Sequence, residues 1–306
     1  MFEIITVQII KMLFLLLLGI LCYRKKLIDL NGSKALSNLL LLIISPVLAV
    51  TCLQTEYNTE LVTGLLISFG ISILIHGGMA ILFTFLIRKY GNEHYAVERF
   101  SSMYSNCGFM GIPLVLSILG NEGLLYLTAY TIVFNVFAWS HGVSIMTGKT
   151  SLQHLRKVLV APVILASVLG MILFFLRIRL PDLVLDTCSY ITGMNTPIAM
   201  LIAGISVAQT NLPSMLKRKK LYLISVFKLL LMPSLVLLLL LVLPVPPKVA
   251  CTMMVAASCP SGAMGTAFAL RFQKDDKYAA ELYSFTTICS LITVPGFVYA
   301  AEHLLM

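Results

Sequence analysis

The chain has 306 residues, of which 59% are hydrophobic and 11% charged, and its mean hydropathy is +0.96. This composition excludes a soluble domain, whose apolar core is enclosed by a charged surface, and predicts an integral membrane protein. The net charge of +9 does not indicate nucleic-acid binding, because the basic residues are spread over short segments between apolar stretches.

Ten apolar stretches are each long enough, at about 20 residues, to cross a bilayer as a helix. The first is expected to be a retained helix and not a cleaved signal peptide, because the basic cluster Arg24, Lys25 and Lys26 follows its apolar run. The connections are short, so we expect an all-α membrane protein without a soluble domain. In chain order the stretches cover residues 2–23, 35–53, 61–87, 100–119, 123–147, 158–176, 184–208, 221–243, 248–270 and 278–301.

The lysines and arginines favour every second connection. Seventeen of the 22 lie in the first, third, fifth, seventh and ninth connections, whereas the opposite connections hold only Arg177, Arg179 and Lys248. The positive-inside bias places the odd-numbered connections in the cytoplasm. We therefore expect a multi-pass protein of the cell (plasma) membrane with both termini extracytoplasmic.

One motif occurs twice, inside two of the apolar stretches. Residues 108–111 (Gly-Phe-Met-Gly) match residues 262–265 (Gly-Ala-Met-Gly) at an offset of 154, and Ser45-Pro46 matches Thr196-Pro197 at an offset of 151. Both offsets correspond to a repeat of five helices. An odd number of spans places two copies in opposite orientations, as in the inverted repeats of secondary transporters.

Both copies of the motif carry residues that break helices. Glycine and proline weaken helices, and an unpaired backbone amide in lipid is costly, so such breaks persist only beside a protein-enclosed, hydrated cavity. Paired broken helices in matching halves are typical of a secondary transporter's substrate site. The sequence thus predicts one integrated transporter domain of two inverted five-helix repeats, residues 1–150 and 151–306, with broken fourth and ninth helices.

The segments around the motifs resemble a known family. Residues 106–113 (Asn-Cys-Gly-Phe-Met-Gly-Ile-Pro), residues 259–269 (Cys-Pro-Ser-Gly-Ala-Met-Gly-Thr-Ala-Phe-Ala), and Gly19 followed by a basic cluster resemble the auxin efflux carrier family. That family includes the plant PIN-FORMED auxin exporters and bacterial permeases assigned to malate or malonate. The resemblance covers essentially the whole chain, and N-x-x-x-M-G-I-P is its most specific part.

The resemblance implies an architecture and a mechanism. Broken helices 4 and 9 would cross near the midplane of the membrane. Helices 1, 2, 6 and 7 would form a scaffold. Helices 3–5 and 8–10 would form a transport unit that moves against the scaffold by an elevator-like motion. It also suggests a homodimer. Two departures are visible: only about ten residues separate helices 5 and 6, and Pro260 precedes its glycine pair whereas Pro113 follows its own. The chain therefore resembles the compact bacterial members.

The predicted substrate site lies at the two helix breaks. The first amides of each second half-helix are unpaired and carry a partial positive charge, so they can hold an anion without a fixed cation. Asn106 is the main candidate, because a carboxamide within a span is costly unless paired or functional; its alternative role is to cap the broken helix. The other expected binding residues at the breaks are Ser105, Gly108, Gly111, Pro113, Pro260, Ser261, Gly262, Gly265 and Thr266.

Two lysines lie inside predicted helices. Lys11 is near the middle of the first span, so we expect it to point into the bundle and to bind the anion, an acidic residue or the carbonyl end of a broken helix. Lys228 lies only about two turns from the cytoplasmic edge of its span, so we expect its ammonium to reach the interface. No deeply placed carboxylate is evident, although sodium can bind through carbonyl and hydroxyl oxygens alone.

These features favour a secondary active transporter or facilitator of small organic anions such as carboxylates, working by elevator-type alternating access. The alternatives are a sodium-coupled organic anion symporter resembling bile acid transporters, and a membrane sensor that binds a ligand without moving it. Neither H-E-x-x-H nor G-x-S-x-G occurs in a fitting context, so we expect no enzyme. Seven cysteines without C-x-x-C spacing predict neither a metal site nor a cofactor. The expected partners are a small organic anion and the lipid bilayer, and the residues leave the substrate, the direction and the coupling ion open.

Overall fold

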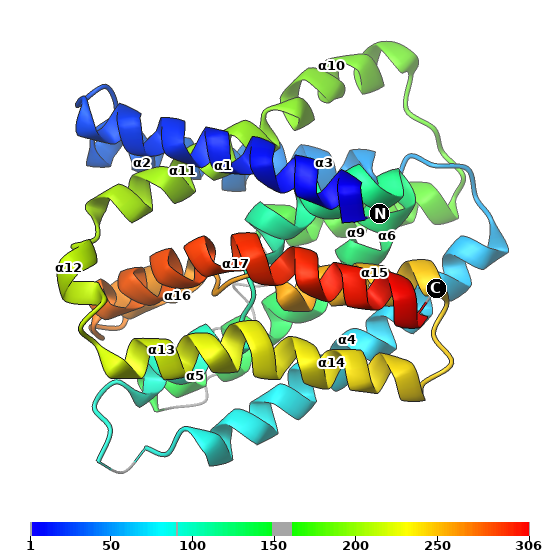
Figure 1. Ribbon diagram of the computed structural model, residues 1–306. Coiled ribbons are helices and arrows are strands. Elements are labelled where there is room, and N and C mark those ends of the chain that lie inside the picture. Colours follow the sequence, from blue (N-terminus) through cyan, green and yellow to red (C-terminus); the bar gives the residue numbers. More distant parts are fainter. Residues whose placement is uncertain (1, 90, 149–160, 306) are drawn as a thin grey trace.

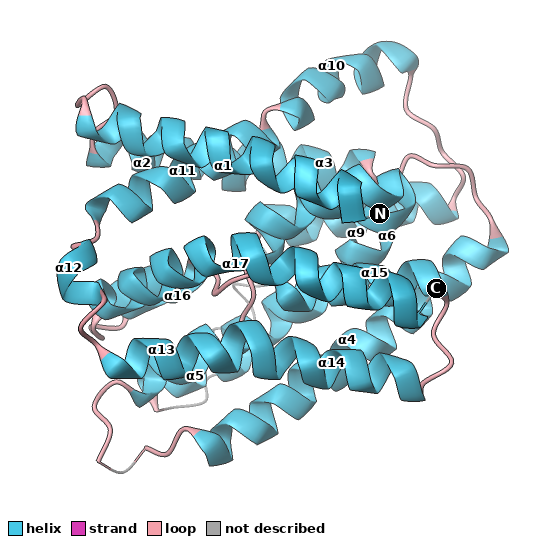
Figure 2. Ribbon diagram, viewed as in Figure 1, coloured by secondary structure: helices cyan, strands magenta, loops and turns pink. Residues whose placement is uncertain are grey.

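The computed structural model describes residues 2–89, 91–148 and 161–305 of the chain (Figure 1). Over these ranges every element is a helix or a loop (Figure 2), apart from one isolated antiparallel bridge between Ser105 and Ser261. The prediction of an all-helical protein is therefore confirmed.

Short π-helical turns, denoted η, interrupt several of the α-helices. Before residue 149 the helices are, in chain order, α1 (Phe2–Arg24), α2 (Leu30–Leu39), η1 (Leu40–Ile44), α3 (Ser45–Thr51), α4 (Thr59–Leu86), α5 (Tyr95–Met103), η2 (Cys107–Gly111), α6 (Ile112–Phe137), η3 (Ala138–Gly142) and α7 (Val143–Thr147). After residue 160 they are α9 (Pro162–Phe175), α10 (Asp182–Gly193), α11 (Asn195–Gln209), α12 (Leu212–Met215), α13 (Lys219–Val226), η4 (Phe227–Leu231), α14 (Met232–Val242), α15 (Pro247–Ser258), α16 (Met264–Arg271) and α17 (Asp276–Leu305).

Seven helical stretches in the described part of the chain are long and apolar enough to cross a membrane, which makes this a multi-pass membrane protein. They are Glu3–Arg24, Leu30–Thr51, Thr59–Leu86, Cys107–Thr147, Asp182–Gln209, Lys219–Val242 and Asp276–Leu305. The ten predicted stretches differ from these seven in three places. Stretches 100–119 and 123–147 share one of them, stretch 158–176 holds the shorter helix α9, and stretch 248–270 is divided into α15 and α16.

Gly120 divides α6 into two segments. Its φ of +60° and ψ of −149° lie in a region that only glycine enters without strain. The break falls between predicted stretches 100–119 and 123–147, so the expected connection is a sharp change of direction and not a loop.

Prolines explain three of the four π-helical turns in the described ranges. η1, η2 and η4 each end two residues before a proline, namely Pro46, Pro113 and Pro233. A proline ring collides with the carbonyl four residues earlier in a helix, and that residue lies inside the preceding π turn in each case. The wider turn relieves this collision and lets the helix continue.

The two ends of the molecule carry different connections (Figure 1). Both termini lie at the right of the view, with the α3–α4, α9–α10 and α14–α15 connections. The α1–α2, α4–α5 and α16–α17 connections and α12 lie at the left. The basic cluster after α1 and the basic residues 217–220 therefore lie at the same end, opposite the termini, as the alternation of charge in the sequence predicts.

Two packing features frame the interior. α15 is enclosed along most of its length, with residues 249–258 all buried. α1 and α11 run side by side, and a Cβ on Gly204 would collide with the carbonyl of Leu16, while one on Gly19 would collide with that of Leu201. The small residues thus bring these two helix backbones into direct contact.

Candidate functional site

The two helix breaks predicted from the repeated motif contact each other directly. The Asn106 N–H donates to the Pro260 carbonyl at 2.7 Å, and the Gly262 N–H donates to the Tyr104 carbonyl at 2.8 Å. These bonds form the isolated antiparallel bridge between the two breaks. Backbone groups freed by the broken helices thereby satisfy one another in a region where lipid offers no partner. We call the segments 104–106 and 259–263 the crossover.

Serine side chains hold the crossover to the surrounding helix ends. The Ser261 hydroxyl donates to the Ser101 carbonyl at 2.8 Å, and the Ser261 N–H donates to the Thr286 hydroxyl at 3.2 Å. The Ser105 hydroxyl donates to the Ala257 carbonyl at 3.3 Å. Each segment of the crossover is thus bonded to the end of a helix from the other half of the chain.

Four helix ends meet at the crossover. α5 and α15 end there with their carbonyls, and η2 and α16 begin there with their amides. The first amides of a helix have no intrahelical acceptor and carry a partial positive charge. Neither Asn106 nor Ala263, at the N-cap positions, makes a side-chain capping bond. The alternative capping role of Asn106 is therefore not observed, and its carboxamide lies beside the Tyr283 hydroxyl instead.

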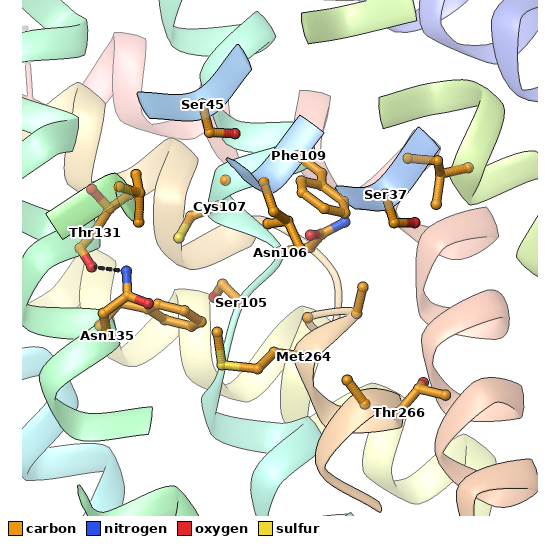
Figure 3. Close-up of a pocket in the computed structure, with 18 of the residues that line it drawn as sticks. Ser37, Ser45, Ser105, Asn106, Cys107, Phe109, Thr131, Asn135, Met264 and Thr266 are labelled. Carbon is orange, nitrogen blue, oxygen red and sulfur yellow. Dashed lines mark hydrogen bonds between the residues drawn. The ribbon is translucent and has the colours of Figure 1, made fainter. Parts of the chain in front are cut away.

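A cavity adjoins the crossover. Its floor consists of residues 105–109 and 262–264, which include the beginnings of η2 and α16. The walls come from α2, η1, α3, α6, α9, α11 and α17 and are mainly apolar. Figure 3 shows hydroxyls and amides that project among the apolar side chains. The polar residues of the lining include Ser37, Ser45, Thr131, Asn135, Ser167, Ser206, Thr266 and Tyr283.

The cavity extends to the end of the molecule that lies opposite the termini. Lys34, Gln209, Arg271 and Asp276 line it, and they belong to the ends of α2, α11, α16 and α17 at the left of Figure 1. Asp276 is the one acidic residue among the described lining residues, and it lies at the start of α17 and not in either break. The crossover itself contributes no acidic side chain to the lining.

Five of the predicted binding residues line the cavity. They are Ser105, Asn106, Gly108, Gly262 and Thr266. Pro260 and Ser261 build the crossover without lining the cavity, and Gly111, Pro113 and Gly265 lie outside the lining, in the helices behind it. The structure therefore brings the two copies of the motif together, while the binding role of these residues stays a prediction.

Polar groups with unused hydrogen-bonding capacity surround the floor. Asn106 is 6% exposed, and Figure 3 shows its carboxamide directed toward the side of Ser37. The Thr266 hydroxyl is buried and has no hydrogen-bond partner within the described ranges, whereas the buried Tyr283 hydroxyl lies beside the Asn106 carboxamide. Asn135, in contrast, donates to the Thr131 carbonyl at 2.7 Å. A solute in the cavity could satisfy the first three groups.

The expectation that Lys11 points into the bundle is wrong. Lys11 is exposed on α1 and does not line the cavity. α1 turns the buried stripe of Ile5, Ile9 and Met12 toward the bundle, and Lys11 falls on the opposite, exposed side with Phe14. Hydropathy shows that a helix is apolar on all sides, but not which of its sides meets the protein.

The expectation that Lys228 reaches the interface is also wrong. Its side chain is completely buried, and its Nζ donates to the Ser105 hydroxyl at 2.5 Å, to the Met232 sulfur at 3.0 Å and to the Ala257 carbonyl at 3.3 Å. Lys228 shares one helix face with Ser225 and Met232, and only the structure shows that this face is buried.

The cavity wall formed by α2, η1 and α3 was not among the residues predicted from the sequence. Ser33, Ser37, Leu41 and Ser45 line the cavity at intervals of four residues along α2, η1 and α3. This spacing places them on one helix face. A search for small polar residues at helical spacing would have detected them, whereas Ser45 was considered only as part of a repeated Ser/Thr-Pro pair.

Comparison with known proteins gives two findings. A family model described as "Membrane transport protein" matches residues 4–154 and residues 146–298. The chain is also 25% identical, over 201 residues, to an uncharacterized transporter of Methanocaldococcus jannaschii. That alignment covers 63% of this chain and 64% of the other protein, so it spans less than two thirds of the relative's length.

Proposed function

Since the chain belongs to the membrane transport protein family, which is the auxin efflux carrier family that its motifs resemble, we propose that it carries small organic anions across the membrane by alternating access. Membership makes it a transporter, and it agrees with the expectation that the protein is not an enzyme. Carboxylates are the substrate class that we propose.

One observation carries the proposal: two amide ends of broken helices open into the same cavity. η2 begins at Cys107 and α16 at Met264, and both residues line the cavity floor. The partial positive charges of two helix ends then converge on one volume. Without a carboxylate in the crossover to compete, an anionic group is the ligand that this floor favours.

The remaining lining supports the same substrate class. Asn106 supplies an amide donor beside the floor, and Thr266 and Tyr283 supply hydroxyls, of which that of Thr266 has no partner among the described residues. Lys34 and Arg271 are basic residues at the far end of the cavity, where they would raise the local concentration of an anion. The mainly apolar walls would accommodate the carbon skeleton of an organic acid.

We further propose two inverted repeats, residues 1–150 and 151–306, arranged as a scaffold and a moving unit. The scaffold would contain α1–α3 and α9–α11, and the moving unit α4–α7 and α13–α17. The cavity lies between these groups, with walls from α2, α3, α9 and α11 on one side and the crossover, α6, α16 and α17 on the other. With the basic connections in the cytoplasm, its opening would face inward, and the termini would lie outside a plasma membrane.

Uptake of labelled malate, malonate and indole acetate into proteoliposomes tests the proposed function, with voltage, sodium and proton gradients imposed in turn. We expect saturable, voltage-sensitive flux that falls at least about tenfold in Asn106→Ala, which corresponds to the loss of one charge-assisted hydrogen bond. Lys11→Met is the matched control, because Lys11 is exposed on α1 away from the cavity, and it should keep wild-type flux.

The alternatives give different results in the same experiment. Flux that requires sodium would favour the sodium-coupled symporter. Saturable binding without flux under every gradient would favour a ligand sensor. Failure of all three anions to bind would show that small carboxylates are the wrong substrate class.

A further inference from the structure

We propose that the Lys228 ammonium is a built-in cation at the carbonyl end of α15, and that it takes the place of a coupling sodium ion. In other transporters with discontinuous helices, the carbonyl ends of half-helices hold the coupling ion. The inference rests on the proposed function, because it concerns how charge is balanced around an anion at the crossover. Its consequence is transport that does not depend on sodium.

The contacts of Lys228 are those of a bound cation. Nζ donates to the Ala257 carbonyl at 3.3 Å, and Ala257 lies in the last turn of α15, which ends at Ser258. Carbonyls in the last turn of a helix lack intrahelical donors, and this end of a helix carries a partial negative charge. The ammonium therefore lies where a positive charge is most favoured, although it is tethered to η4 and cannot leave.

Ser105 connects this cation to the cavity. Its hydroxyl accepts from Lys228 at 2.5 Å and donates to the Ala257 carbonyl at 3.3 Å. Ser105 also lines the cavity floor. The ammonium is thus one hydroxyl away from the volume in which an anion would bind, and it is on the protein side of that volume.

No carboxylate forms an ion pair with Lys228 among the residues that the structure describes. The other groups that it faces are the Met232 sulfur, the thiols of Cys107 and Cys259, and His76 from α4. A fully buried charge without a counter-ion is unfavourable, and the partial charge of one helix end offsets only a fraction of that cost. An anion in the cavity would complete the neutralisation, so the ammonium favours the loaded carrier, as a co-transported sodium ion would.

Thermal stability and flux together test this role, first on the wild-type protein. Purified protein is compared in sodium chloride and in choline chloride of equal ionic strength. We expect the same apparent Tm and the same anion flux in both salts. Stabilisation or stimulation of the wild-type protein by sodium would overturn the proposal, even where anion transport itself is confirmed.

The Lys228→Ala variant opens the carbonyl end of α15 to a free cation. We expect its Tm to fall, and to rise again by about 3 °C or more when sodium or propylammonium is added. The wild type and the matched control Lys11→Ala should not respond. A Lys228→Ala variant that folds but gains nothing from either cation would contradict a cation site.

Lys228→Met separates charge from packing, because methionine fills a similar volume without a charge. We expect this variant to fold and to lose at least about tenfold in flux. Wild-type flux in Lys228→Met would overturn the proposal, because the ammonium would then only stabilise the structure of the crossover. If neither variant folds, the sodium independence of the wild type still decides the question. Absence of all anion flux in the wild type, by contrast, would overturn the proposed function.

Discussion

The α1–α11 contact and the crossover both bring backbones unusually close, but by opposite means. At the first, Gly19 and Gly204 let two continuous helices touch through van der Waals contact alone. At the second, the helices are broken, and Asn106 and Gly262 donate their amides to the opposite segment. The first contact joins helices that are continuous at the point of contact, whereas the second joins broken helices through hydrogen bonds between their segments.

This difference indicates where a solute can bind in an apolar helix bundle. A contact made by glycine packing leaves no polar group unused, so it suits a fixed frame. A contact made between broken helices leaves helix ends inside the bundle, and the nearby Thr266 hydroxyl has no hydrogen-bond partner among the described residues. Only the second kind of contact can exchange its hydrogen bonds with a ligand, and its residues line the cavity, whereas Gly19 and Gly204 do not.

Gly204→Leu should have the largest effect on folding, because it disrupts the packing contact between α1 and α11. The new side chain would occupy the place of the Leu16 carbonyl, so α1 and α11 would have to separate. Overpacking costs about 1–3 kcal/mol in free energy of unfolding where the neighbouring side chains can move aside. Here the neighbour is a backbone carbonyl, which cannot move aside alone, so the cost should be larger. We expect little folded protein by size-exclusion chromatography. Gly70→Ala, where a Cβ meets nothing within 4 Å, should behave as wild type; a well-folded Gly204→Leu would refute the packing role.

Gly262→Val should damage transport more than stability. A Cβ there would lie 3.3 Å from the Tyr104 and Ser105 carbonyls, so the crossover must shift by a few tenths of an ångström. Displaced binding groups lose much of their effect, and we expect flux to fall at least about tenfold. Proteoliposome uptake and Tm measured on the same preparation would check this. Unchanged flux would mean that the crossover geometry is not critical.

Ser261→Ala removes one bond that holds the crossover. The Ser101 carbonyl would lose its donor at 2.8 Å in a buried position, which costs about 1–3 kcal/mol. We expect Tm to fall by a few degrees and flux to fall only a few-fold, with Ser261→Thr retaining most of both. Equal stability of wild type and Ser261→Ala would show that this hydroxyl contributes little.

Gly108→Ala should give the smallest change and the most specific one. A Cβ there meets no protein atom within 4 Å, and the residue lines the cavity floor. We therefore expect unchanged Tm and an increase of a few-fold in KM, because the methyl group keeps the anion from the first amides of η2. Wild-type KM in a folded Gly108→Ala would contradict anion binding at this helix end.

Much of the site could be predicted from the sequence because helix breaks are local. Glycine and proline in residues 108–113 and 259–265 indicated where the fourth and ninth helices would break; the first break lies directly before its motif, at residues 104–106, and the second lies within its motif, at residues 259–263. The match between the two motifs indicated that the breaks belong together. The family predicted from these residues is confirmed by the family match, whereas the ten-helix inverted repeat stays a prediction.

The sequence by itself determined the properties that depend on a few neighbouring residues. These are the membrane-spanning helices, the π turns before Pro46, Pro113 and Pro233, the turn at Gly120 and the segregation of basic connections to one end. Each follows from backbone dihedral angles, local hydrogen bonds or the cost of moving charge across lipid.

The tertiary structure alone decided which side of each helix faces the protein. Lys11 and Lys228 both lie in apolar helices, yet one is exposed and the other is completely buried against the crossover. Hydropathy is nearly the same on all sides of such helices, since lipid and a protein core are about equally apolar. The direction of a side chain therefore depends on partners distant in sequence, here the Ser105 hydroxyl and the Ala257 carbonyl.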